Sequence, residues 1–245
     1  MRAVLVIAGS DSSGGAGIAR DLRTLAELGM PAACALTAVT AQTDAALLAC
    51  EVLRPQLVRA QIESAFATHS IAAVKIGMLA NADTVCSVAQ ALALHSDVPS
   101  VLDPVLLSSS GAVLLNEAGR CELLKTLLPQ VTLLTPNIPE AALLLGEARA
   151  ASEAQLLRQG QELRARGARA VLIKGGHAEG PDSVDLLISA QGVERLQSPR
   201  LASYLRGTGC ALASAIAAYL GQGLALAVAC RQAKQYLSAL LQQAL

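Results

Sequence analysis

Short apolar runs alternate along almost the whole chain with glycine-containing or polar turns and with longer amphipathic segments. The run from residue 3 to residue 8 is apolar at every position and ends at Gly9, a pattern typical of a strand buried on both faces. Similar runs predict strands at 33–39, 71–76, 98–102, 131–134 and 170–173. The segments between them predict helices at 18–28, 55–69, 82–95, 117–128 and 152–166, with a final pair of helices after residue 207.

This alternation predicts an α/β fold with a three-layer, doubly wound, mainly parallel sheet and helices on both faces. Segments 184–188 and 193–196, on either side of Gln191-Gly192, predict one antiparallel pair. We find no linker, internal repeat or low-complexity stretch in the 245 residues. The sequence therefore predicts a single domain spanning residues 1–245.

The amino-acid composition limits the kinds of binding partner that we expect. Hydrophobic residues make up 53% of the chain and charged residues 16%, which is enough for a large core. Lys and Arg (19) balance Asp and Glu (19), so neither a nucleic acid nor a membrane surface is expected as a partner. The uncharged stretch 207–230 is divided by Gly221-Gln222-Gly223 into pieces too short to span a membrane. Six separated cysteines without a CxxC motif are typical of a cytoplasmic protein.

Polar and glycine residues follow the predicted strands at one end. Because the carboxyl ends of parallel strands share one edge of a sheet, we expect these residues to line a single crevice. They are Gly9, Gln42, Met78, Asp103, Asn137 and Lys174-Gly175-Gly176.

Two glycine-rich turns carry candidate chemistry. The turn before the helix that starts near Thr208 offers free backbone N–H groups to an anion, and the same field is expected to lower the pKa of the Cys210 thiol. A plain connection into a core helix with a buried cysteine explains the same residues equally well. The loop 9–17 is neither a Walker A motif nor a full dinucleotide fingerprint. Asp21 follows this loop, and its alternative role is a solvated carboxylate at a helix start.

The order and combination of these motifs resemble bacterial hydroxymethylpyrimidine/phosphomethylpyrimidine kinases of thiamine biosynthesis, members of the ribokinase-like superfamily. The similarity extends from residue 4 to about residue 240. The motifs that carry it are Ile7 to Ile18 with Asp21, Thr40-Ala41-Gln42, Lys75 to Leu79, Asp103-Pro104-Val105, Thr135 to Glu140, Lys174 to His177 and Gly207-Thr208-Gly209-Cys210.

The resemblance implies transfer of the ATP γ-phosphoryl group to the hydroxymethyl group of an aminopyrimidine and then to the resulting monophosphate. It implies ATP and Mg²⁺ as cofactors, and a homodimer. For substrate binding it implies Gly9, Asp21, Gln42, Met78 and Val105. For ATP and Mg²⁺ it implies Asp103, Asn137, Glu140, Lys174 and Thr208, with Asp103 and Glu140 at the metal. For catalysis it implies Lys174, an anion hole of Gly207, Thr208 and Gly209, and Cys210 as the acceptor of the substrate hydroxyl proton.

One segment departs from the family pattern. Tyr204-Leu205-Arg206 stands where the family usually has an Asn/Asp-Thr-His run. Arg206 fits a phosphate contact or a solvated surface position equally well. His177 and Lys234 are weaker candidates, for which we expect loop structure and a solvated helix face. Two other functions stay open, a pyridoxal/pyridoxine kinase and a catalytically weakened pyrimidine-binding protein.

Overall fold

The computed structural model describes residues 2–43, 45–108, 110–175, 181–202 and 205–244. Nine strands in it form one sheet: β1 (Arg2–Asp11), β2 (Ala32–Gln42), β3 (Leu47–Val52), β4 (Ser70–Ile76), β5 (Ser100–Leu102), β6 (Leu133–Leu134), β7 (Val171–Ile173), β8 (Asp182–Ser189) and β9 (Gly192–Pro199). Their order is β3-β2-β1-β4-β5-β6-β7-β8-β9. Neighbouring strands are parallel in the series β2, β1, β4, β5, β6 and β7, whereas β3, β8 and β9 are antiparallel additions at the two edges.

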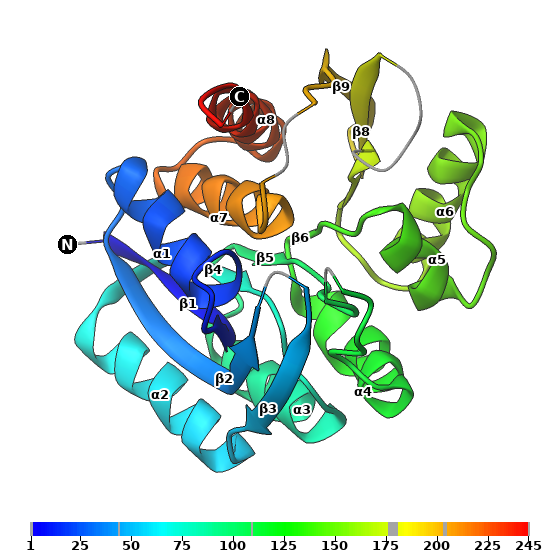
Figure 1. Cartoon of the computed structure of the whole chain (residues 1–245). Coiled ribbons are helices and arrows are strands. Elements are labelled where there is room, and N and C mark those ends of the chain that lie inside the picture. Colours follow the sequence, from blue (N-terminus) through cyan, green and yellow to red (C-terminus); the bar gives the residue numbers. More distant parts are fainter. Residues whose placement is uncertain (1, 44, 109, 176–180, 203–204, 245) are drawn as a thin grey trace.

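Helices cover both faces of this sheet, which confirms the predicted fold class (Figure 1). One face carries α1 (Gly17–Glu27), α7 (Thr208–Gly221) and α8 (Leu226–Gln242). The other carries α2 (Pro55–Thr68), α3 (Ala82–Leu92), η1 (Ala93–His95), α4 (Glu117–Glu122), η2 (Leu123–Leu127), η3 (Leu128–Gln130), α5 (Ile138–Leu145) and α6 (Glu153–Ala165).

The continuous apolar pattern of the first strand follows from these two layers. Leu5 and Ile7 pack into the core beneath α2 and α3, whereas Val4 and Val6 pack into the core beneath α1 and α7. Successive side chains of a strand point to opposite faces, so a strand covered on both sides is apolar at every position. Burial on both faces therefore agrees with the position of β1 inside the sheet, between β2 and β4.

Several expected boundaries differ in the structure. Strand β1 continues through Gly9 to Asp11 instead of ending before the glycine loop. Strand β3 was not predicted, because most of its side chains are exposed and show no alternation of apolar and polar positions. The helix expected at 117–128 changes from α4 to a π-helical turn in η2 and a 3₁₀ turn in η3.

The cysteines differ in burial. All six are free, but only Cys230 is buried in the core, and Cys34, Cys50 and Cys121 are exposed. Helices α7 and α8 are separated at Gly223, as the sequence predicted. Within the described parts of the chain, no helix combines the length and the apolar character that crossing a membrane requires.

Candidate active site

A cavity of about 540 Å³ opens at the carboxyl ends of the parallel strands. It lies where the strand order reverses: β2 is next to β1 on one side, and the later strands continue from β4 on the other side. This reversal point is the usual position of a ligand site in an open α/β sheet. Of the residues that the resemblance assigns to substrate, ATP, metal or catalysis, all but one line it. They are Gly9, Gln42, Met78, Asp103, Val105, Asn137, Glu140, Lys174, Gly207, Thr208, Gly209 and Cys210. Gly175, also expected at this edge, does not line the cavity, and Gly176 lies outside the described residues.

Asp21 is the exception. Its side chain is fully buried, and its carboxylate accepts hydrogen bonds from Lys75 Nζ (2.7 Å) and from Ser214 Oγ (2.8 Å). Lys75 lines the cavity and Asp21 does not. The structure thus gives no support to a solvated Asp21 or to a direct contact between Asp21 and the substrate, and instead makes Asp21 the partner of a cavity lysine.

Three charged side chains gather at the ends of β5, β6 and β7. Lys174 Nζ lies 2.6 Å from Asp103 Oδ1 and 3.8 Å from Glu140 Oε2. Burial raises the pKa of Glu140 to about 7, the nearby Asp103 adds to this shift, and Lys174 opposes it. Burial also lowers the pKa of Lys174, but the charges of Asp103 and Glu140 outweigh burial and raise it, so Lys174 remains a cation.

Asn137 and Glu140 have a structural role as well as a place in the cavity. The Glu140 backbone N–H donates to Asn137 Oδ1 (2.8 Å), and the Asn137 backbone N–H donates to Glu140 Oε2 (2.7 Å). This reciprocal pair is a capping box that starts α5. The cap holds the Glu140 carboxylate at the cavity beside Lys174.

The N-terminus of α7 faces the same cavity. Gly207 is the N-cap residue with φ +73°, a conformation that favours glycine. A Cβ on Gly207 would also overlap the carbonyl oxygen of Gly15, so a side chain is excluded there. The backbone N–H groups of the first helical turn have no partners within the helix and can bind an anion. The Gly207–Gly209 turn therefore has the geometry expected of an anion hole.

Cys210 lies in this first turn and lines the cavity, but its expected ionisation is wrong. Burial raises the pKa of the thiol to about 11, and the charges of Asp21 and Asp103 also favour the neutral form. Lys75 opposes this shift without reversing it. The resting group is therefore a neutral thiol.

Two ion pairs at the cavity were not predicted as site features. Lys75 stands within an apolar strand, and a charged residue inside a run expected to be buried on both faces was the signal that could have identified it. Lys234 was expected on a solvated helix face, but it is buried and binds Asp185 Oδ2 (2.8 Å) and Ser183 Oγ (3.0 Å). Asp185 in turn accepts the backbone N–H of Gly175 (2.8 Å), which fixes the end of β7.

The structure describes Leu205 and Arg206 of the segment that differs from the family pattern. Tyr204 and His177 lie outside the described residues. Arg206 lies within them, lines the cavity and is 9% exposed, so a solvated surface position is wrong for it.

Comparison with known proteins gives the family. The profile of the family described as phosphomethylpyrimidine kinase matches residues 11–245. A hydroxymethylpyrimidine/phosphomethylpyrimidine kinase of Salmonella typhimurium is 43% identical over 241 residues, which cover 98% of this chain and 91% of that protein. The chain belongs to the hydroxymethylpyrimidine/phosphomethylpyrimidine kinases of thiamine biosynthesis.

Solved structures agree with this family and add a related one. The phosphomethylpyrimidine kinase of Clostridium difficile 630 is 35% identical, with a TM-score of 0.85 over 98% of this chain and 99% of that chain. The pyridoxal kinase of Staphylococcus aureus, in complex with AMP-PCP and pyridoxal, is 30% identical, with a TM-score of 0.89 over 98% of this chain and 88% of that chain. The backbone thus resembles both kinases closely, whereas the sequence is more similar to the pyrimidine kinase.

Proposed function

We propose that this chain transfers the γ-phosphoryl group of ATP first to the hydroxymethyl oxygen of 4-amino-5-hydroxymethyl-2-methylpyrimidine and then to the phosphate of the monophosphate. The observation that carries the proposal is one cavity that joins a pocket for a small ring to an anion hole and a Lys-Asp-Glu cluster. In each step an acceptor oxygen forms a bond to the γ-phosphorus, the bond to ADP breaks, and the acceptor releases any proton it carries.

The substrate end of the cavity combines apolar and polar contacts. Met78 and Val105 offer apolar surface to a heteroaromatic ring, and Gln42 offers both a donor and an acceptor to ring nitrogens and an amino group. Gly9 leaves room beside Met78, because a Cβ there would lie 2.9 Å from the Met78 sulfur. Asp21 acts indirectly in this arrangement, by holding Lys75 at the cavity.

The phosphate end supplies charge and backbone donors. Lys174 and the N–H groups of Thr208 and Gly209 are suited to the negative charge that phosphate oxygens carry during transfer. Cys210 lies beside this turn and is proposed to accept the hydroxyl proton as a thiolate formed from its resting thiol. Asn137 keeps Glu140 in place through the helix cap.

Two carboxylates fit the expected metal. Mg²⁺ usually binds one or two carboxylates and completes its coordination with water and phosphate oxygens. Asp103 and Glu140 provide such a pair, and within the described residues no cluster of three or more metal-binding side chains is found. When bound, Mg²⁺ would neutralise charge on the ATP phosphates, while Lys174 holds the two carboxylates at one place.

We also infer a cytoplasmic homodimer acting as one kinase domain. The single sheet extends from one edge of the fold to the other, which supports one domain. Strand β3 forms an edge of the sheet and exposes Leu48 (71%), and the neighbouring β2 exposes Val39 (47%), apolar side chains that a second copy would cover. The six free cysteines suit a reducing compartment.

The pyridoxal kinase alternative is favoured by one observation, the TM-score of 0.89 to the pyridoxal-bound enzyme. The weakened binding protein is disfavoured, because Asp103, Glu140, Lys174 and Cys210 line a single cavity together with the anion hole. The experiment that decides is ATP consumption by the purified protein with Mg²⁺ and, separately, hydroxymethylpyrimidine, its monophosphate and pyridoxal. Turnover of both pyrimidines is expected. Turnover of pyridoxal alone, or pyrimidine binding without turnover, would replace the proposal by one of the alternatives.

A further inference from the structure

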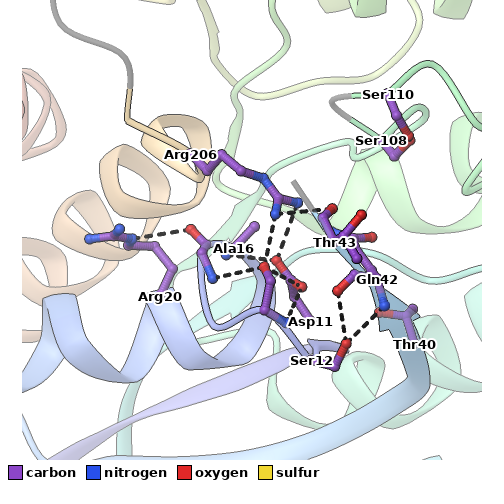
Figure 2. Close-up of polar contacts among 12 residues, drawn as sticks. Asp11, Ser12, Ala16, Arg20, Thr40, Gln42, Thr43, Ser108, Ser110 and Arg206 are labelled. Carbon is purple, nitrogen blue, oxygen red and sulfur yellow. Dashed lines mark hydrogen bonds and ion pairs between the residues drawn. The ribbon is translucent and has the colours of Figure 1, made fainter. Parts of the chain in front are cut away.

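The side chain of Arg206 connects parts of the chain that are far apart in sequence. It precedes the Gly207–Gly209 turn and reaches across to the glycine loop and to the end of β2 (Figure 2). Nη1 donates to Ser13 Oγ (2.8 Å) and to the Thr43 carbonyl oxygen (3.4 Å), and Nη2 lies 3.4 Å from Asp11 Oδ2. A guanidinium is suited to such a task because its planar fork presents several donors at once.

Asp11 explains why a positive charge is needed at this point. Its Oδ1 accepts the backbone N–H (2.9 Å) and the hydroxyl (2.8 Å) of Ser13, and its Oδ2 accepts the backbone N–H of Ala16 (3.0 Å). These bonds hold the glycine loop in its curved form. The Asp11 side chain is buried, and a buried carboxylate requires a charged partner or a full set of donors. Arg206 supplies the charge.

The same network reaches Gln42 of the substrate pocket. Ser12 Oγ donates to the Gln42 carbonyl oxygen (3.0 Å) and accepts the Gln42 backbone N–H (2.8 Å) (Figure 2). Arg206 binds the carbonyl of Thr43, the next residue. The backbone of Gln42 is therefore held by Ser12 of the glycine loop, and that of the adjacent Thr43 by Arg206.

The glycine loop and the anion-hole turn also pack directly on each other. A Cβ added at Gly15 would lie 3.3 Å from Arg206 Cβ, and one added at Gly207 would overlap the Gly15 carbonyl oxygen. We call residues 11–16, 42–43 and 206–209 the three-loop rim. The side chain of Arg206 contacts both the glycine loop and the β2 end, and its backbone continues directly into the anion-hole turn.

We propose that Arg206 is a positioning residue that locks the three-loop rim and so fixes Gln42 and the anion-hole turn relative to each other for pyrimidine binding. The inference rests on the proposed function for its substrate. It replaces a direct contact between Arg206 and a substrate phosphate, because both Nη atoms already bind protein oxygens. It predicts that Arg206 affects both pyrimidine substrates alike, with or without their phosphate.

Kinetics of Arg206→Gln, Arg206→Lys and Asp11→Asn test this assignment. We expect Arg206→Gln to raise the KM for both pyrimidines about tenfold, with the KM for ATP changing less than about twofold. Arg206→Lys should recover part of the loss, because an ammonium can pair with Asp11 but cannot also reach Ser13 and Thr43. Asp11→Asn combined with Arg206→Gln should cost less than the two separate effects together. Arg59→Gln, which removes an exposed arginine paired with Glu63 on α2, is the matched control.

Hydrogen exchange provides a readout that does not depend on turnover. Without substrate, peptides spanning 12–17 and 40–43 should exchange faster in Arg206→Gln than in the wild type, while peptides of α3 stay unchanged. If the wild type shows no kinase activity, the proposed function fails but this test of the rim can still be read. Unchanged exchange in the rim peptides would overturn the inference. A loss confined to the phosphorylated pyrimidine would overturn it as well, in favour of a direct phosphate contact. If Arg206→Gln does not fold, the same criteria apply to Arg206→Lys.

Discussion

Lys75 Nζ lies 2.7 Å from Asp21 Oδ2, and neither side chain is exposed to solvent. The lysine comes from the carboxyl end of β4 and the aspartate from the first half of α1. Burial lowers the pKa of Lys75, but the charges of Asp21 and Asp103 and the hydrogen bond to Asp21 outweigh burial and raise it. The pair therefore keeps a cation in the wall of the cavity.

Breaking this pair from one side should destabilise the fold. Lys75→Met leaves a buried carboxylate and Asp21→Asn leaves a buried ammonium, so each should lower the free energy of unfolding by about 3–5 kcal/mol. Urea unfolding at pH 7 measures this, and the double variant should lose less than the sum of the single variants. Ser214→Ala removes one hydrogen bond to Asp21 and should cost about 1 kcal/mol. Single variants within about 1 kcal/mol of the wild type would show that the pair contributes little.

Most of the fold could be predicted because burial imposes a clear pattern. Strands β1 and β4 are covered on both faces, so their apolar runs identify them. Strand β3 lies at an exposed edge, and nothing in Leu47–Val52 requires alternation of apolar and polar residues. Burial on both faces made the interior strands recognisable in the sequence. The edge strand was missed because it lacks this burial.

The positions of the site residues could be predicted better than their charge states. The rule that parallel strands end at one edge brings Gln42, Asp103 and Lys174 to one cavity. The pairing of Asp21 with Lys75 depends on how α1 packs against β4, which no local pattern encodes. The raised pKa of Cys210 depends on burial by the whole site.

The role of Cys210 as a proton acceptor makes a prediction for the pH profile of turnover. The pKa of the thiol is raised to about 11, so the thiolate is a minor species at pH 7 and increases about tenfold per pH unit below that value. If the thiolate accepts the hydroxyl proton, kcat of the wild type should rise steadily from pH 7 to pH 9.5. Single-turnover rates at saturating ATP and hydroxymethylpyrimidine are the measurement.

Cys210→Ala provides the comparison for this profile. It should be slower than the wild type and should lose the rise with pH. The exposed Cys121 offers a matched replacement elsewhere in the chain, and Cys121→Ala should keep the wild-type profile. A rise with pH that survives in Cys210→Ala would assign the base to another group and leave Cys210 a packing role.

Lys174 should be required for transfer more than for binding of the pyrimidine. Its ammonium lies between Asp103 and Glu140 next to the anion hole, so Lys174→Gln removes the cation where charge develops on the phosphoryl group. We expect kcat to fall on the order of 10³-fold, with the KM for hydroxymethylpyrimidine changed less than about threefold. Steady-state kinetics measure both constants. Lys125→Gln, on the exposed side of η2, should leave both unchanged. A Lys174→Gln variant with near-normal kcat would remove this lysine from the catalytic set.

Glu140 should make the stability of the ligand-free protein depend on pH in an unusual direction. Its pKa is raised by burial from an ordinary 4.5 to about 7, so the folded state holds a proton that the unfolded state has lost between these values. The free energy of unfolding contributed by Glu140 therefore falls as pH rises from 4.5 through 7.

Glu140→Gln removes this titration while its amide oxygen can still accept the Asn137 N–H of the helix cap. Urea unfolding from pH 4.5 to 8, without nucleotide or metal, should show wild-type stability falling relative to the variant as pH rises. The variant should also need more Mg²⁺ for half-maximal ATP turnover, because one of the two carboxylates proposed for the metal is gone. Stability curves that stay parallel would mean that Glu140 is ionised throughout this range. An unchanged Mg²⁺ requirement would exclude Glu140 as a ligand and leave it the role of capping α5.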